Sequence, residues 1–270
     1  MAPTDSERPD APDLTAGDAS GRGSLFSPAP KAVLFDIDGT LVDSNYLHVD
    51  AWSRAFEQVG HPVDTWRIHR SIGLDSDRLI EDLLGDDRGS AGGDHGEGSG
   101  EGSDAGAGSD ASEGDDLGDR AKQLHTDIYA EMNDRLRPLP GAVELLRALH
   151  EAGVRVVLAT SAPKNELDVL TGVLDCDDAI HATTSSDDVD TAKPEPDIVN
   201  IALERAGVTA AEALFVGDAV WDMKAAGRAG VRSIGVRTGG FGADELIEAG
   251  AIDVFDDAAA VLRAFRGASR

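Results

Sequence analysis

The stretch VLFDIDGTLVDS, residues 33–44, decides the expected fold of this chain. Its apolar start is typical of a buried strand, yet this strand runs into two carboxylates, Asp36 and Asp38, followed by a glycine turn at Gly39. Residues two apart in an extended chain face the same side, so Asp36 and Asp38 should point together while Ile37 faces the core. Two anions at the end of a buried strand need a compensating positive charge, which must come from elsewhere in the chain.

A regular alternation of helices and apolar strands begins near residue 141. Strands are expected at 154–160, 179–184, 213–218, 231–237 and in the segment IDVF, with helices at 142–151, 165–174, 196–206 and 221–229. This succession predicts an α/β fold, a Rossmann-like, doubly wound parallel sheet with residues 31–36 as its first strand.

The segment between the first strand and this alternation has helical periodicity instead. Apolar residues recur at helical spacing in LHVDAWSRAFEQVG, and the two prolines of RPLPG later break the pattern as a hinge would. We therefore expect an all-α cap domain at 45–136, inserted into an α/β core made of residues 31–44 and 137–270.

Two segments have the composition of disordered chain. Residues 1–30 contain five prolines and no apolar periodicity, which predicts a disordered acidic tail. Residues 86–119, inside the predicted cap, contain 11 Gly, 11 Asp or Glu and 5 Ser. That composition predicts a flexible acidic insertion rather than a folded element.

Composition argues against several classes of partner. The formal net charge is −27, whereas nucleic-acid binding needs a basic surface. No apolar run approaches the ~18 residues of a membrane span, and the N-terminus lacks a secretory signal, so we expect no membrane association. The single cysteine, Cys176, allows no internal disulfide and fits a cytoplasmic location. The oligomeric state stays open, and a monomer is compatible with the sequence.

Polar side chains stand at the carboxyl end of each main strand or in the loop that follows it. In open α/β sheets, ligands bind beyond these ends, so the side chains should converge on one crevice although they lie far apart in the sequence. The set comprises Asp36, Asp38, Thr160, Ser161, Lys193, Asp218 and Asp222.

This set suits phosphate chemistry. Two unit charges ~4 Å apart repel by on the order of 4 kcal/mol at an effective dielectric constant of about 20, so four clustered carboxylates favour a hard divalent cation such as Mg²⁺. The seven histidines show no spacing that indicates a softer metal. Lys193 adds a positive charge for a phosphoryl group, Thr160 adds a hydroxyl donor, and Gly39 lets backbone amides face the phosphate.

Four motifs occur in a fixed order: DIDGT (36–40), a Thr after an apolar strand, KP (193–194) and GDAVWD (217–222). Together they resemble the haloacid dehalogenase-like superfamily of aspartate-nucleophile phosphohydrolases. DGTLVDS followed by a helical insertion is similar to the branch that contains phosphoglycolate phosphatase and β-phosphoglucomutase. The resemblance covers residues 31–265 apart from the acidic insertion.

The resemblance implies a role for each core residue. Asp36 would attack phosphorus and form an aspartyl-phosphate, while Asp38 would protonate the leaving alcohol and then activate water. The phosphoryl group would be held by Thr160, Ser161, Lys193 and Gly39. Mg²⁺ would be held by Asp36, the backbone carbonyl of Asp38, Asp218 and Asp222.

The same resemblance makes the helical domain a mobile cap that closes over the substrate. His48, Arg70 and Gly73 lie in cap segments that meet the substrate in this branch, although a surface or structural role fits His48 and Arg70 as well. Asp43 and Ser44 are expected to be turn and helix-capping residues.

The implied function is a Mg²⁺-dependent phosphatase acting on a small phosphorylated metabolite. A sugar phosphomutase is the first alternative, because DSNYLHVDAW resembles the mutase segment. However, GDAVWD has acids four apart where mutases carry an adjacent pair, and Ile72 stands where a mutase tends to carry a lysine. A 2-haloacid dehalogenase would lack the second acid, Asp38. A non-catalytic binding module would not need the complete acid set.

Overall fold

The computed structural model describes residues 23–26, 29–85, 110–189 and 191–268. At its centre is a parallel sheet of six strands in the order β3-β2-β1-β4-β5-β6. The strands are β1 (Ala32–Phe35), β2 (Arg155–Ala159), β3 (Ala182–Thr184), β4 (Ala213–Gly217), β5 (Arg232–Val236) and β6 (Ala251–Phe255). The chain order reverses direction beside β1, which makes the sheet doubly wound, as the sequence predicts.

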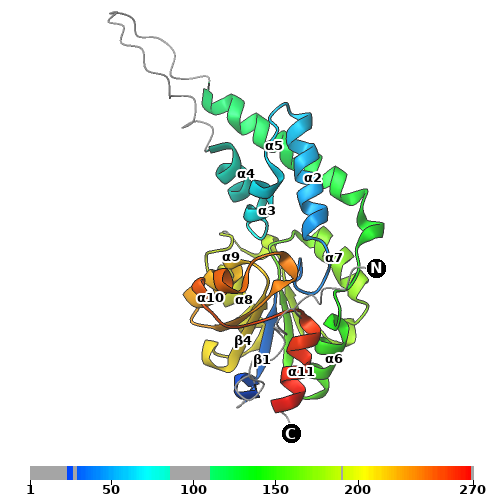
Figure 1. The fold of residues 1–270 in the computed structure, drawn as a ribbon, viewed down its shortest axis with the longest axis vertical. Helices are drawn as coiled ribbons and strands as arrows, with labels where there is room; N and C mark the ends of the chain where they lie inside the picture. The colour runs from blue at the N-terminus through cyan, green and yellow to red at the C-terminus, as the bar shows by residue number, and fades with distance from the viewer. Residues whose placement is uncertain (1–22, 27–28, 86–109, 190, 269–270) are drawn as a thin grey trace, which may run out of the picture.

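Helices cover both faces of the sheet (Figure 1). On one face lie α6 (Ala142–Glu151), α7 (Lys164–Leu174) and α11 (Ala258–Ala268). On the other lie α8 (Asp197–Ala206) and α9 (Val220–Arg228), with α10 (Ala243–Glu248) packed beside them. Short 3-10 turns join these elements: η4 (Asp177–Ala179), η5 (Ser186–Asp188), η6 (Ala210–Glu212) and η7 (Arg237–Gly239).

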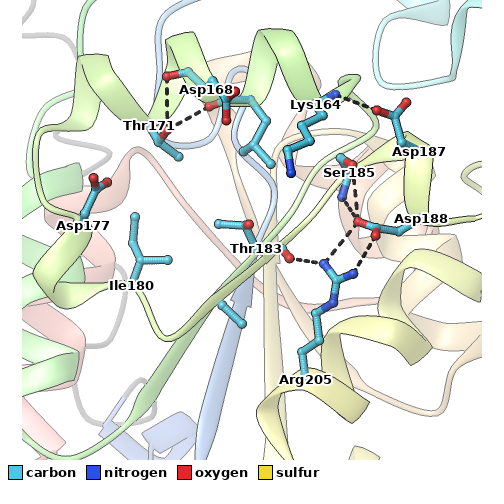
Figure 2. Close-up of a pocket in the computed structure, with 12 residues that line it drawn as sticks. Lys164, Asp168, Thr171, Asp177, Ile180, Thr183, Ser185, Asp187, Asp188 and Arg205 are labelled. Carbon is cyan, nitrogen blue, oxygen red and sulfur yellow. Dashed lines mark hydrogen bonds and ion pairs between the residues drawn. The ribbon is translucent and has the colours of Figure 1, made fainter.

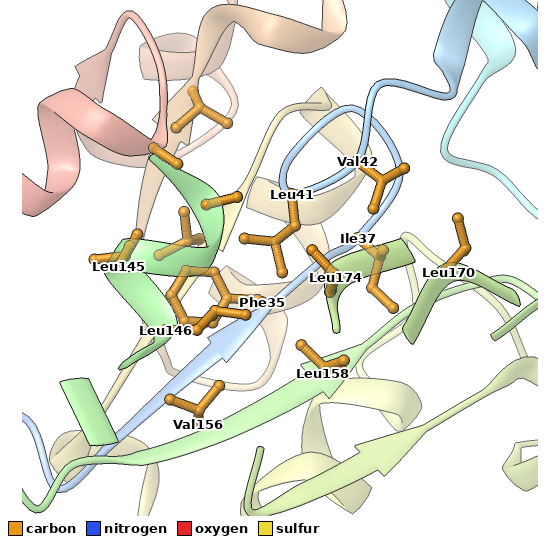
Figure 3. Packing of buried hydrophobic residues seen from close by; sticks show 14 of the residues in the cluster. Phe35, Ile37, Leu41, Val42, Leu145, Leu146, Val156, Leu158, Leu170 and Leu174 are labelled. Carbon is orange, nitrogen blue, oxygen red and sulfur yellow. The ribbon is translucent and has the colours of Figure 1, made fainter. Parts of the chain in front are cut away.

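The apolar residues of β1 contribute to the hydrophobic cores on both faces of the sheet, because alternate residues of a strand point to opposite faces. Val33 and Phe35 pack with α6, α7 and α11, whereas Ala32 and Leu34 pack with α8 and α9. Figure 3 shows Phe35 among side chains of β2 and α6, with Ile37 and Leu41 just beyond the strand. Ile37 is fully buried, so it faces the core as the spacing of Asp36 and Asp38 predicts.

The helical insertion lies beyond the carboxyl ends of the strands (Figure 1). It comprises α2 (Asn45–Gln58), α3 (Thr65–Ser71), α4 (Ser76–Gly85), α5 (Asp110–Ala130) and η3 (Asn133–Arg135). Its helices enclose a small core of their own, in which Trp52, Phe56 and Leu79 are buried. None of the helices that the structure describes is both long and apolar enough to cross a membrane.

Two predicted disordered segments contain structured residues. Helix α5 begins at Asp110, inside the segment 86–119, because the helix packs on α4: Gly118 is buried, and a Cβ there would lie 2.9 Å from Ile80. Within the predicted tail, η1 (Gly23–Phe26) brings Phe26 edge-on to Phe265 of α11. The prediction of disorder is wrong at these residues, and the rest of both segments lies outside the described residues apart from 29–30.

Candidate active site

Acidic residues meet at the carboxyl ends of the two central strands. Asp36 directly follows β1, and its backbone N–H donates to the carbonyl of Val216 in β4 (3.0 Å). Asp218 directly follows β4, and Asp222 lies in the first turn of α9. Carboxylate oxygens of Asp36, Asp218 and Asp222 lie within 4.8 Å of one another. The structure thus brings together three of the acids that the sequence singles out.

Lys193 supplies the positive charge that the opening motif requires. Its side chain is 1% exposed, and Nζ lies 2.5 Å from Oδ1 of Asp36 and 2.8 Å from Oδ1 of Asp222. Burial opposes the charged form of this lysine, but the carboxylates of Asp222 and Asp36 outweigh that effect and raise its pKa. Lys193 is therefore a permanent cation inside the acid cluster.

One lysine does not neutralise three carboxylates. Burial raises the pKa of Asp36 well above its usual range, and neighbouring carboxylates add to the rise while Lys193 opposes it. Burial and Asp222 likewise raise the pKa of Asp218 to about 7. A bound cation would relieve this repulsion, and oxygen ligands of this kind suit a hard divalent metal. The cluster can therefore hold a metal ion.

Two residues that the sequence analysis missed hold Asp218 in place. Thr40 Oγ1 and Asn45 Nδ2 each donate to one oxygen of Asp218, both at 2.8 Å. Asn45 Oδ1 is buried without a hydrogen-bond partner among the described residues, so it offers a further oxygen beside the acids. Thr40 follows the DIDG sequence directly, and that position is the signal that could have identified it.

Gly39 provides a tight turn beside these groups. Its φ is +71°, and a Cβ on it would come within 2.6 Å of Asp218 Oδ2. Its own N–H donates to the carbonyl of Val42 (2.9 Å), so this amide serves the loop. Gly39 therefore forms the turn, and binding of phosphate by Gly39 stays a prediction.

Asp38 lies outside the cluster of three acids and contacts residues at the start of the helical insertion. Ser44 Oγ donates to its Oδ1 at 2.6 Å, and His48 Nε2 lies 3.5 Å from the same oxygen. Ser44 stands at the start of α2, but its side chain does not cap the helix, because it binds Asp38 instead. Burial opposes ionisation of Asp38, yet the contacts with His48 outweigh it and lower its pKa.

His48 links Asp38 to a second carboxylate, Glu166, which the sequence analysis did not identify. His48 Nε2 lies 3.2 Å from Glu166 Oε1, and Nδ1 lies 3.1 Å from Nε2 of His125. The His48 ring also stacks on Tyr129 with ring centroids 3.9 Å apart. Burial lowers the pKa of His48, but Glu166 and Asp38 raise it more, to about 10. His48 therefore acts as the cation between these two carboxylates.

A cavity of about 80 Å³ lies between the insertion and the core, and Asp36, Asp38 and His48 line it. Thr160 and Ser161 also line it, and Thr160 Oγ1 lies 3.5 Å from Asp38 Oδ2. A larger hollow of about 560 Å³ adjoins the cavity and shares four lining residues with it: Asp75, Ser76, Ser161 and Pro163.

The two remaining predicted cap residues have different positions. Gly73 (φ +94°) lines the cavity, and a Cβ on it would lie 3.0 Å from Ala219 Cβ in the loop that carries Asp218. Arg70 does not line the cavity. It binds Glu245 (2.6 Å) and lies 4.4 Å from the ring centroid of Phe241, so it joins the insertion to the core.

A separate hollow of about 410 Å³ lies beside the edge strand β3 (Figure 2). None of the predicted site residues lines it. Arg205 spans it, pairing with Asp188 (2.5 Å) and donating to the carbonyl of Thr183. This hollow is therefore distinct from the acid cluster.

Comparisons with known proteins agree with this geometry. The model of the haloacid dehalogenase-like hydrolase family matches residues 30–230. A phosphoglycolate phosphatase from Pseudomonas putida is 30% identical over 82% of this chain and 74% of its own. A phosphorylated carbohydrates phosphatase from Thermotoga maritima is 28% identical over 82% of this chain and 92% of its own.

A solved structure shows the same likeness. The crystal structure of a hydrolase from Pseudomonas syringae is similar with a TM-score of 0.74 and 31% identity, covering 86% of this chain and 96% of that one. The chain therefore belongs to the haloacid dehalogenase-like hydrolase family, and it is an enzyme.

Proposed function

We propose that this enzyme is a Mg²⁺-dependent phosphatase that acts on a small phosphorylated metabolite through an aspartyl-phosphate intermediate. The observation that carries the proposal is the placement of Asp36. Its carboxylate lines the cavity, lies 2.5 Å from the buried Lys193, and shares the cavity with Asp38. The proposed nucleophile thus has a cation beside it and a second acid in the same cavity, and the related phosphatases support the same reaction class.

In the first step, an oxygen of Asp36 attacks phosphorus while the bond from phosphorus to the leaving oxygen breaks. The phosphoryl group passes to Asp36, and Lys193 stabilises the negative charge on the phosphoryl oxygens. Thr160 Oγ1 accepts the N–H of Ala162 (3.0 Å), which orients its hydroxyl so that it can donate a hydrogen bond. Thr160 and Ser161 would bind these oxygens.

Proton transfer falls to Asp38. The leaving alkoxide takes a proton from Asp38, and in the second step Asp38 takes a proton from water as the water oxygen attacks phosphorus and releases Asp36. Burial opposes ionisation of Asp38, but contacts with His48, whose Nε2 lies 3.5 Å from Asp38 Oδ1, lower the pKa of Asp38 in the free enzyme. Asp38 must therefore gain a proton from water before the first step.

The metal site would be formed by Asp36, Asp218, Asp222 and the backbone carbonyl of Asp38. When bound, Mg²⁺ would supply positive charge against the phosphoryl oxygens and offset the repulsion among the acids.

The size and lining of the cavity favour a phosphatase over a phosphomutase. The cavity has a volume of about 80 Å³, and this small size suits a small metabolite. A mutase must hold a second phosphate at the far end of its substrate, which calls for a cation there. Among the described residues, the cavity lining includes Ile72 and Gly73 but no lysine. Asp38 argues against a dehalogenase, because a 2-haloacid dehalogenase would lack this second acid.

Phosphate release from p-nitrophenyl phosphate tests the proposal. We expect hydrolysis that requires Mg²⁺, stops with a chelator, and is lost in Asp36→Asn. Full activity of Asp36→Asn would remove the proposed mechanism, and release of halide from 2-haloacids without phosphatase activity would replace the proposed function.

A further inference from the structure

The charges around the cavity are unevenly distributed. Its phosphoryl end has Asp36 with Lys193 just behind it. Glu166 and Asp75 also line the cavity, and oxygens of Glu166 and Asp38 lie within 4.8 Å of each other, so Glu166 stands beside the proposed proton donor to the leaving group. Over the part of the chain that the structure describes, no lysine or arginine lines the cavity. A leaving group would therefore meet negative charge.

The two histidines that line the cavity offset only part of this negative charge. Both ring nitrogens of His48 have partners, since Nε2 contacts Glu166 and Asp38 and Nδ1 contacts His125. His125 is buried against the ring of Trp52, with centroids 4.2 Å apart. His48 therefore has no ring nitrogen left for an anionic group of a substrate, and burial lowers the pKa of His125, which keeps that ring uncharged.

The cations nearest to the cavity mouth are also paired. Arg78 and Lys122 line the larger hollow outside, where Arg78 lies 3.7 Å from Glu195 and Lys122 lies 2.7 Å from Asp77. Oδ1 of Asp75 accepts the N–H groups of Asp77 (2.9 Å) and Arg78 (3.1 Å), so this oxygen serves the start of α4. Glu166 instead lies beside Asp38, the proposed proton donor to the leaving group.

Helix α7 fixes the position of Glu166. The residue lies in its first turn, where its N–H donates to the carbonyl of Pro163 (3.1 Å), just after the Thr160–Ser161 loop. Only one oxygen, Oε1, contacts His48. The second oxygen can accept a hydrogen bond from a hydroxyl, whereas a carboxylate there would meet the like charges of Glu166 and Asp38, which share the single cation His48.

We propose that Glu166 is a specificity-determining residue that selects uncharged, hydroxyl-bearing leaving groups and rejects leaving groups with a carboxylate. The substrate class is then the monophosphate of a small polyol or sugar rather than a phosphorylated carboxylic acid. This inference rests on the proposed phosphatase function.

Matched substrate pairs test it. Ethylene glycol monophosphate and 2-phosphoglycolate differ only in a CH₂OH group against a carboxylate, as do glycerol 3-phosphate and 3-phosphoglycerate. With Mg²⁺ present, we expect the wild type to have a kcat/KM tenfold or more higher for the hydroxyl member of each pair. In Glu166→Gln, this ratio should fall at least tenfold, mainly through a lower KM for the carboxylate member.

Asp168→Asn is the matched control. It removes the same charge from the same helix, but Asp168 is exposed and lines the hollow of Figure 2 instead of the cavity. Its substrate ratio should equal that of the wild type. Equal ratios in Glu166→Gln and Asp168→Asn would overturn the role of Glu166, and so would a wild type that prefers the carboxylate members. If the wild type releases no phosphate from any substrate, p-nitrophenyl phosphate included, the proposed function itself fails.

Discussion

Nζ of Lys193 lies 2.5 Å from Oδ1 of Asp36, although 157 residues separate them in the chain. The fold creates this contact, because β1 and the loop before α8 meet at the carboxyl edge of the sheet. Nζ also lies 2.8 Å from Asp222, so a single buried cation joins two of the acids.

Replacing Lys193 with methionine should therefore affect both stability and activity. Breaking a buried ion pair by removing one partner costs about 3–5 kcal/mol, since it leaves charge uncompensated. We expect a loss of this size in urea unfolding, and a fall in kcat of about 100-fold or more because a transition-state donor is lost. Lys224→Met, at an exposed lysine on α9, is the control and should change neither quantity much. A stable, active Lys193→Met protein would contradict this reading.

Asn45→Ala should weaken metal binding. Asn45 orients Asp218, and loss of a group that orients a metal ligand costs about 10–100-fold in affinity. The Mg²⁺ concentration for half-maximal phosphatase activity should rise by that factor, with a smaller change in activity at saturating Mg²⁺. Asn165→Ala, at an exposed position on α7, should leave the Mg²⁺ dependence unchanged. Identical Mg²⁺ curves for the two variants would show that Asn45 does not support the metal site.

Gly73→Ala should impair closure of the helical insertion over the core. The substitution adds a Cβ 3.0 Å from Ala219 and 3.2 Å from Trp221, in addition to the strain of φ +94°. Gly60→Ala is the control, because Gly60 has φ +80° but nothing within 4 Å of its Cβ position. Both should lose about 1–2 kcal/mol of stability, yet only Gly73→Ala should raise KM severalfold. A comparable KM increase in Gly60→Ala would assign the effect to backbone strain.

The ion pair in Figure 2 predicts a pH dependence of stability. Arg205 lowers the pKa of Asp188, so the pair stabilises the fold above the unfolded-state pKa of Asp188, about 4, and that contribution is lost as the pH falls through the folded-state pKa. Arg205→Met should cost up to about 1 kcal/mol between pH 5 and 7, because the pair is partly exposed. The cost should shrink below about pH 4. A cost that persists there would point to the bond with Thr183 instead.

The strand ends that carry the core site residues could be predicted from the sequence. Apolar strands ending in Asp36, Thr160 and Asp218 show in the sequence because strand burial and strand-end polarity both leave local patterns. Residues of the helical insertion that contact the site leave no such pattern in the sequence. Their positions depend on how α2 and α3 lie across the core.

Arg70 and Glu166 illustrate that limit. A basic residue in a cap helix suggests contact with substrate, yet Arg70 binds Glu245 at the side of the site. Glu166 resembles any acid in the first turn of a helix, where it is favoured by the helix dipole. Its place beside His48 becomes visible only when α2 and α7 are seen together.

The most direct test of the proposed reaction is to quench the enzyme with acid during turnover of p-nitrophenyl phosphate and to map the bound phosphoryl group by peptide mass spectrometry. The mechanism predicts one phosphoryl group, located on Asp36, that accumulates in Asp38→Asn, in which water is no longer activated, and is absent from Asp36→Asn. Phosphate release with no covalent phosphoryl group in Asp38→Asn, or a group on another residue, would contradict the assignment of Asp36 as the nucleophile.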